Sequence, residues 1–320
     1  MHLLIPFAAC LDPQAQALLR ELRLPHLQRL LSRLQPTERD TGTSDSLSPP
    51  HERVLAHWLG LSAADGLIAW AANQGQPELP DGTSAAGAAW GWITPCHWQV
   101  GRDQMHMDPP AALGLQESES RALLAAMQPY FEEDGIHLRY ANPTCWLARS
   151  ERFNDLASAS LDRVIGHDPS DWLPRGAAAS VLRRLQNEMQ MLLYTHPVNE
   201  LRLTQGKIPV NSFWLSGSGS LPAVRPATSQ AAVDAPQVPR ALADAALRQD
   251  WPAWAQAWET LDATACADLL RAVDQTPTRA GLTLCGERNA QTYGAPANPW
   301  LARAKYFFSR TSLTQQLDSL

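Results

Sequence analysis

The chain has 320 residues, enough for one large domain or two of moderate size. A hydrophobic content of 45% excludes a wholly disordered chain, and the net charge of −6, without a basic stripe, argues against direct nucleic-acid binding. No apolar run reaches the roughly 18 residues that a membrane-spanning helix needs, and Leu3–Leu11 is too short and wrongly flanked for a secretory signal. We therefore expect a cytoplasmic protein that makes no membrane contact.

The N-terminal region predicts a strand followed by helices. His2–Phe7 is a short apolar run, typical of a buried strand. Leucines at helical spacing predict helices around Leu18–Leu22 and over Pro25–Leu34, and Pro25 suits a first helical turn. Residues 35–50 are rich in Ser, Thr, Asp and Pro and predict a loop, whereas residues 52–72 have a helical pattern.

The rest of the chain continues the alternation of strands and helices. The remaining expected elements are a strand in Trp90–Val100, a helix ending at Gly135, a hairpin over Ile136–Leu147, a helix over Ala178–Tyr194, a strand over Ile208–Leu215, a linker over 221–240, a helix bearing Trp251, Trp254 and Trp258, a strand over Gly281–Gly286 and a mostly helical segment over Pro299–Leu320. This order predicts an α/β fold in which helices flank a largely parallel sheet.

One strand runs directly into a glycine-rich segment, Ser216-Gly217-Ser218-Gly219. Ligands in open α/β sheets bind beyond the carboxyl ends of strands, where glycines let backbone N–H groups approach an anion. A plain tight turn explains the same residues, so both interpretations stay open. Arg288 follows the last predicted strand and could reach the same sheet edge, to contact either an anion or an acidic neighbour.

Potential metal ligands are few. His97, Asp103, His106 and Asp108 lie within twelve residues, and imidazole with carboxylate suits zinc or manganese. A solvated polar turn accounts for them equally, and the five cysteines lack the CxxC spacing of a zinc or redox site. We predict reduced thiols, no metal site and no cofactor.

A set of short motifs resembles a known family. The motifs are His196-Pro197-Val198-Asn199, Arg202, Gly206-Lys207-Ile208-Pro209 and Asn211-Ser212-Phe213-Trp214-Leu215-Ser216-Gly217-Ser218-Gly219. In this order and spacing they resemble the segment that closes the inserted domain of archaeal-type cofactor-independent phosphoglycerate mutases. Weaker similarity covers Leu24–Leu30, Trp92–Arg121 and Ala178–Tyr194. Over its length the chain is similar to a bacterial group of mutase-like proteins called RpfE-type regulatory proteins.

This resemblance implies an alkaline-phosphatase-like core interrupted by an inserted α+β lobe. We expect the core over 1–85 and 200–320 and the lobe over 86–199. Enzymes of the family hold two divalent metals with Asp and His ligands and transfer a phosphoryl group through a serine.

The sequence departs from the family where those ligands should be. The first strand, which should end in a metal-binding Asp, is followed by Ala8-Ala9-Cys10, and no histidine occurs after His196. The stretch after Gly219 is about 100 residues, short of a catalytic half, and Cys96-His97-Trp98 replaces the expected substrate-binding residues. We therefore expect a truncated core without mutase activity, and leave open whether another activity exists.

The resulting hypothesis is a catalytically degenerate, regulatory protein that binds a protein partner or a small anionic ligand. The ligand-binding candidates are Asn199, Arg202, Asn211, Ser216, Gly217, Ser218 and Gly219, with His196, His97 and Arg288 as secondary candidates. One alternative is a hydrolase or phosphotransferase that uses a serine of Ser216–Ser220, with His196 as base. A second alternative is an adaptor for a nucleic-acid-processing enzyme such as an exonuclease.

Overall fold

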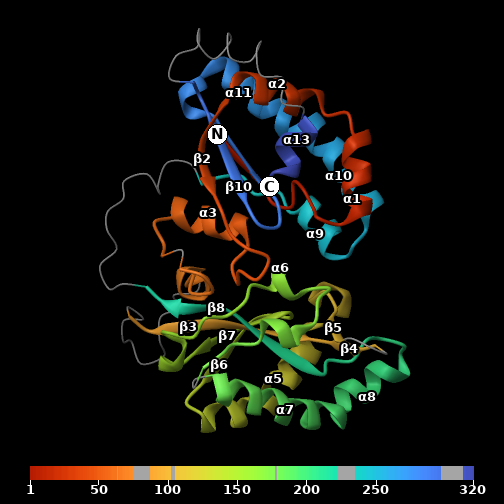
Figure 1. Ribbon diagram of the computed structural model, residues 1–320. Coiled ribbons are helices and arrows are strands. Elements are labelled where there is room, and N and C mark those ends of the chain that lie inside the picture. Colours follow the sequence, from red (N-terminus) through yellow and green to blue (C-terminus); the bar gives the residue numbers. More distant parts are fainter. Residues whose placement is uncertain (63, 75–86, 102–104, 177–178, 222–234, 297–312) are drawn as a thin grey trace. The chain divides into compact units, whose positions relative to one another are not determined.

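The computed structural model describes residues 1–62, 64–74, 87–101, 105–176, 179–221, 235–296 and 313–320. The chain divides into two compact units (Figure 1). Unit 1 comprises Met1–Gly60 and Thr228–Leu320, and unit 2 is the intervening Leu61–Ala227. The described parts of residues 61–85 and 200–227, which were expected in the core, lie in unit 2.

Each unit contains both helices and strands. The elements of unit 1 are β1 (His2–Ile5), α1 (Pro13–Glu21), α2 (Pro25–Arg33), β2 (Gln35–Asp40), α3 (Pro50–Trp58), α9 (Ala241–Leu247), α10 (Trp251–Leu261), α11 (Ala267–Gln275), β9 (Gly281–Cys285), β10 (Ala290–Gly294) and α13 (Leu313–Asp318). The elements of unit 2 are α4 (Trp70–Gln74), β3 (Ala89–Cys96), β4 (Trp98–Val100), β5 (Met105–Met107), α5 (Glu117–Glu133), β6 (His137–Asn142), β7 (Cys145–Arg149), α6 (Leu161–Val164), α7 (Ala179–Tyr194), α8 (Pro197–Thr204) and β8 (Ser212–Ser220).

Unit 1 is built on a four-stranded sheet in the order β1-β9-β10-β2. Alternate residues of β1 face opposite sides of the sheet, as the pleat requires. Leu3 and Ile5 join the large apolar cluster that the helices α1, α2, α9, α10, α11 and α13 form, while Leu4 packs with Val54 and Leu55 of α3. In Figure 1 these six helices gather beside the sheet, apart from α3. A strand that is apolar on both faces is therefore covered on both faces.

A buried aspartate ties two helices of unit 1 together. Helix α2 starts after Leu24, which offers no side-chain cap. Asp262 lies in a π-helical turn, Asp262–Cys266, between α10 and α11, and its carboxylate accepts from the backbone N–H groups of Leu27 at 2.7 Å and His26 at 3.2 Å. The same carboxylate lies 3.0 Å from the His26 ring. A residue 235 positions away thus supplies the helix cap that the local sequence lacks.

Unit 2 contains a second four-stranded sheet, in the order β6-β7-β3-β8, and a separate β4-β5 hairpin. The helices α5 and α7 lie along one face of this sheet (Figure 1). Their leucine and methionine stripes pack against Ile93, Trp146 and Phe213 in the core of the unit. On the other face, α4 packs against Trp90 and Trp92. Several of the twelve tryptophans therefore serve as packing residues.

The structure confirms the α/β class and corrects its predicted sheet. Of the strand pairs that the described residues form, only β1 with β9 is parallel, and the others are antiparallel. The predicted largely parallel sheet is therefore observed only in part, because short connections such as the β6-β7 turn join antiparallel neighbours. Residues 35–40, predicted as loop, form β2 at a sheet edge, where a polar strand is tolerated.

Several local predictions agree with the structure. The predicted hairpin is β6-β7, and the predicted helix over Ala178–Tyr194 is α7. Trp251, Trp254 and Trp258 share the buried side of α10. Residues 222–234 of the expected linker and residues 299–312 of the expected C-terminal helix lie outside the described residues.

Candidate functional site

The carboxyl edge of the sheet in unit 1 is the first region to consider. Strands β1, β2 and β9 run in the same direction, since β2 and β9 are both antiparallel to β10. Their ends lead into residues 6–12, 41–48 and 286–289, and we call these three segments the carboxyl edge. Ligands of α/β proteins bind in such places.

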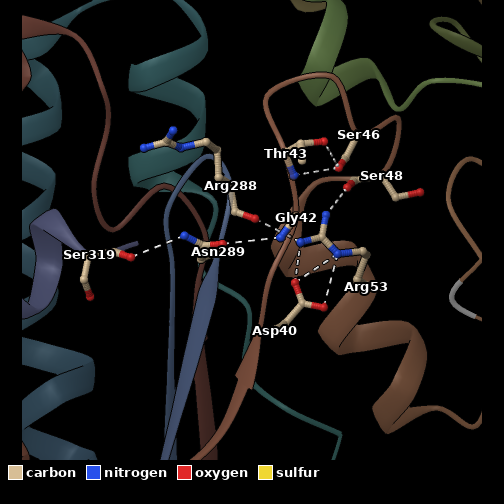
Figure 2. Close-up of polar contacts among 9 residues, drawn as sticks. All are labelled: Asp40, Gly42, Thr43, Ser46, Ser48, Arg53, Arg288, Asn289 and Ser319. Carbon is tan, nitrogen blue, oxygen red and sulfur yellow. Dashed lines mark hydrogen bonds and ion pairs between the residues drawn. The ribbon is translucent and has the colours of Figure 1, made fainter.

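Arg53 connects two segments of the carboxyl edge (Figure 2). Its Nε donates to both carboxylate oxygens of Asp40, at 2.9 and 3.2 Å, and Nη2 also contacts this carboxylate. The remaining bonds run to the carbonyl oxygens of Ser48, at 2.5 Å, and Arg288, at 3.0 Å. Because the Arg53 side chain is only 9% exposed, this ion pair is partly desolvated and holds both loops in place.

Other polar side chains extend this connection. Asn289 accepts from the backbone N–H of Gly42 at 3.3 Å, and its amide donates to the carbonyl of Ser319 at 3.3 Å. Thr43 and Ser46 close a local turn, in which the Thr43 N–H donates to the Ser46 hydroxyl at 3.0 Å (Figure 2). Hydrogen bonds between side chains and backbone therefore determine the shape of these loops.

Carboxylates at the carboxyl edge already have structural partners. Asp40 is paired with Arg53. Asp12 caps α1 by accepting from the backbone N–H groups of Gln14 and Ala15. Glu287 accepts from the backbone N–H of Leu11 at 3.1 Å. These three groups stabilise helix and loop conformations, and each already accepts hydrogen bonds from the protein itself.

The residues after β1 do not fit the divalent-metal site that the family resemblance implies. Ala8, Ala9 and Cys10 are buried in the apolar core. Burial raises the pKa of the Cys10 thiol well above its usual range, with further contributions from Glu287 and Asp12, so the thiol stays protonated. A protonated thiol and two methyl groups offer no ligand for a hard divalent cation.

Arg288 is the secondary candidate that retains an exposed charge. Its backbone carbonyl accepts from Arg53, while its side chain is exposed and extends away from that ion pair (Figure 2). Within the described parts of the chain its guanidinium makes no hydrogen bond or ion pair. The expectation that Arg288 shares a sheet edge with the Ser-Gly segment is wrong, because the two lie in different sheets and different units.

The candidates of α8 lie in the interior of unit 2. Asn199 donates to the carbonyl oxygens of Leu193 and Val210, at 2.8 and 2.6 Å, and accepts from the Val210 N–H at 2.9 Å. Arg202, fully buried, pairs with Glu119 at 2.8 Å and donates to the carbonyls of Leu113 and Ile208. Through these hydrogen bonds, both side chains fix the position of the segment between α8 and β8.

Asn211 and the two candidate histidines are also engaged in backbone contacts. Asn211 pairs with both the N–H and the carbonyl of Trp98, at 2.8 and 2.9 Å. The His97 Nδ1 lies 2.8 Å from the carbonyl of Pro209. His196 is the N-cap of α8, where Nδ1 accepts from the Val198 N–H at 3.2 Å, and burial lowers its pKa.

The Ser-Gly segment is part of a strand and not a loop, which corrects the prediction. Residues Ser212–Ser220 form β8, paired with β3. A Cβ added to Gly217 would lie 3.0 Å from both Trp70 Cβ and the Trp92 ring, and one on Gly219 would lie 3.0 Å from Ala69 Cβ. The glycines therefore allow close packing against α4 and its preceding residue, which sequence patterns alone cannot distinguish from anion binding.

The serines of this segment are buried. Ser218 donates to the Leu156 carbonyl at 2.6 Å and lies 2.7 Å from the Ser158 hydroxyl. Both partners are neutral, so neither can act as the general base that a nucleophilic serine needs. Ser216 is 4% exposed within the same strand.

His97, His106 and Asp108 are the predicted metal-ligand candidates near β4 that the structure describes. His106 lies 3.7 Å from Asp108, and Asp103 is outside the described residues. In the parts of the chain that the structure describes, no three His, Cys, Asp or Glu side chains converge as a metal site would require. In those same parts, no helix is both long and apolar enough to cross a membrane.

Comparison with known proteins shows sequence similarity to one enzyme family. No family model matches the chain. A probable 2,3-bisphosphoglycerate-independent phosphoglycerate mutase of Geobacter sulfurreducens is 41% identical over 125 residues, which are 38% of this chain and 31% of that protein. The corresponding mutase of Methanothrix thermoacetophila is 39% identical over 61 residues, 19% of this chain and 16% of that protein. The matches thus span about a third or less of each relative.

Two solved structures show lower similarity. A cofactor-independent phosphoglycerate mutase from Thermoplasma acidophilum aligns over 93% of this chain and 90% of its own, with 13% identity and a TM-score of 0.36. A Pyrococcus horikoshii protein aligns over 92% and 87%, with 12% identity and a TM-score of 0.42. The sequence matches therefore point to a phosphoglycerate-mutase-like scaffold.

Proposed function

We propose that this protein is a regulatory, ligand- or partner-binding descendant of the phosphoglycerate mutases, on a reduced alkaline-phosphatase-like scaffold, that does not catalyse the mutase reaction. The observation that carries the proposal is the end of β1. The residues there are buried Ala8, Ala9 and a protonated Cys10, where the resemblance requires a metal-binding carboxylate.

Two further observations support this proposal. Asp40, at the end of β2, is paired with Arg53, and Asp12 and Glu287, on the carboxyl edge, accept from backbone N–H groups. Asn199, Arg202 and Asn211 match the family motifs, and their side chains are engaged in contacts within unit 2. A chain that keeps the scaffold but uses its acidic groups for structure is suited to binding rather than to two-metal phosphoryl transfer.

The first test is the mutase reaction itself. Purified protein is assayed for interconversion of 3- and 2-phosphoglycerate with Mg²⁺, Mn²⁺ or Co²⁺ added, beside an active mutase as positive control. We expect no turnover above background. Metal-dependent turnover that scales with protein concentration would contradict the proposal.

The second test concerns the ligand. Thermal-shift measurements with phosphate, phosphorylated metabolites and nucleotides detect any compound that binds the folded state, because binding raises the melting temperature. The expected contact is the exposed guanidinium of Arg288, so Arg288→Ala should abolish the shift. Arg271→Ala, which removes another exposed arginine of unit 1, is the matched control and should retain it. If no compound stabilises the protein, the binding role is restricted to protein partners, an exonuclease among them, and co-purification tests that case.

A further inference from the structure

Helix α8 has a histidine as its N-cap, and the cap fixes the state of the ring. The backbone N–H of Val198 can only donate, so Nδ1 of His196, at 3.2 Å, must carry a lone pair. A neutral imidazole with one bare nitrogen carries its proton on the other, Nε2. The capped helix therefore requires a neutral His196 in the Nε2–H tautomer.

Protonation of His196 removes this cap. The imidazolium has N–H groups on both nitrogens, so Nδ1 would then point a donor at the donor of Val198. The new positive charge would also lie at the positive end of the helix dipole. Pro197, at the first helical position, has no N–H, so the Val198 N–H is the first backbone donor of the helix and would lose the acceptor that Nδ1 provides.

The consequences extend beyond the first turn, because α8 holds its neighbours through two buried side chains. Asn199 bonds to Leu193 and Val210, and Arg202 bonds to Leu113, Ile208 and Glu119. Fraying of α8 would displace both side chains. The ends of α7 and β8 are therefore coupled to the charge of one imidazole.

We propose that His196 makes α8 a pH-responsive element of unit 2, docked when the imidazole is neutral and loosened when it is protonated. This proposal does not rest on the proposed function.

The charged groups around His196 do not offset the effect of burial on its pKa. The neighbouring elements carry several charged groups. Glu119 on α5 is paired with Arg202, and Arg184 on α7 is paired with Glu188 and Asp134. Arg183 also lies on α7, Glu200 lies on α8 itself and Lys207 follows it. None of them contributes to the shift of the His196 pKa, which burial alone lowers. The unfolded or frayed segment therefore binds a proton more readily than the docked helix, and acidification favours the loosened state.

Hydrogen exchange measured by NMR on the full chain tests the proposal. Protection factors, corrected for the intrinsic pH dependence of exchange, are compared between pH 7.5 and pH 4.5 for the amides of α8 and for Val210, whose N–H donates to Asn199. We expect protection to fall by about two- to thirtyfold at the lower pH, the range that corresponds to loss of an N-cap. The ¹⁵N shifts of the ring at pH 7.5 should show the Nε2–H tautomer.

Two variants distinguish the capping contact from the titration of the imidazole. His196→Asn keeps an uncharged capping oxygen and should abolish the pH dependence at these amides. His196→Ala removes the cap and should give low protection at both pH values. The proposal is overturned if the wild-type ring is an Nδ1–H tautomer, if protection at Val210 does not change with pH, or if His196→Asn retains the wild-type pH dependence.

Discussion

Single polar side chains of this protein bind backbone groups that no helix or sheet satisfies. Arg53, Asn199, Arg202 and Asn211 each contact main-chain atoms of another segment. Such bonds are costly to break, because a buried carbonyl that loses its donor is left without a hydrogen bond from either protein or water. At the residue scale, these four side chains therefore stabilise the fold by holding the backbone of other segments.

The Arg53–Asp40 ion pair provides the first prediction at this scale. Asp40→Asn removes the charge that compensates a nearly buried guanidinium, and should lower the free energy of unfolding by about 2–4 kcal/mol. The exposed pair Arg271–Asp268 is the control, and Asp268→Asn should cost less than about 1 kcal/mol. Urea denaturation measures both, and equal effects would contradict the assigned role of Asp40.

The lowered pKa of His2 predicts how the stability of unit 1 changes as the pH falls. Burial, and then the N-terminal ammonium, lowers the His2 pKa from 6.5 to about 4, so the unfolded chain takes up this proton first as the pH falls. The associated stability is complete above pH 6.5 and is lost between pH 6.5 and about 4, by about 3 kcal/mol in all. His2→Asn should flatten this part of the pH dependence in urea titrations, whatever its effect on stability at pH 7. An unchanged slope in the variant would exclude His2 as the cause.

At the scale of elements, β8 shows how packing decides the role of a glycine-rich segment. Gly217 has φ of +61° and Gly206, after α8, has φ of +67°, so an alanine meets similar backbone strain at both. A Cβ at Gly217 would also press against Trp70 and Trp92, whereas one at Gly206 meets open space. The two positions therefore separate backbone strain from packing.

The corresponding prediction is a difference between two variants. Gly206→Ala should cost about 1–2 kcal/mol from strain alone. Gly217→Ala should cost a further 1–3 kcal/mol or so, because the added methyl group overpacks the tryptophans. Chemical denaturation of both variants gives this difference. Equal costs would mean that Gly217 is not held against Trp70, and would reopen the interpretation of β8 as a ligand-facing segment.

On the scale of the whole molecule, one unit is inserted into the other. Unit 2 is continuous in sequence and contains a complete sheet with its own apolar core. Unit 1 is discontinuous, and β1 from its first segment pairs with β9 from its second. The two units therefore have different requirements for folding alone.

A fragment comparison tests this organisation. Residues 61–227 expressed alone should fold cooperatively, because both faces of their sheet are covered from within. Residues 228–320 alone should not fold, since β9 would lack β1 and the apolar cluster would lack α1 and α2. Circular dichroism and thermal unfolding distinguish the outcomes, and a collapsed 61–227 without a cooperative transition would refute the assignment of unit 2.

The sequence by itself determined the elements whose signals are local. Leucine spacing located α1, α2 and α7, and apolar runs located β1 and β9, because each pattern depends on residues a few positions apart. The lack of a carboxylate in Ala8-Ala9-Cys10 is likewise a property of the sequence alone. Strand β2 escaped detection, because a polar edge strand has the composition of a loop.

Tertiary structure decided what depends on distant partners. Strand direction follows from pairing between segments far apart in the chain, so the antiparallel sheets could not be deduced from element order. The roles of Asn199, Arg202 and the Ser-Gly segment were equally hidden, since an amide, a guanidinium or a glycine suits a ligand or a backbone contact alike. Only the neighbours supplied by folding, such as Val210, Glu119 and Trp70, distinguish the two.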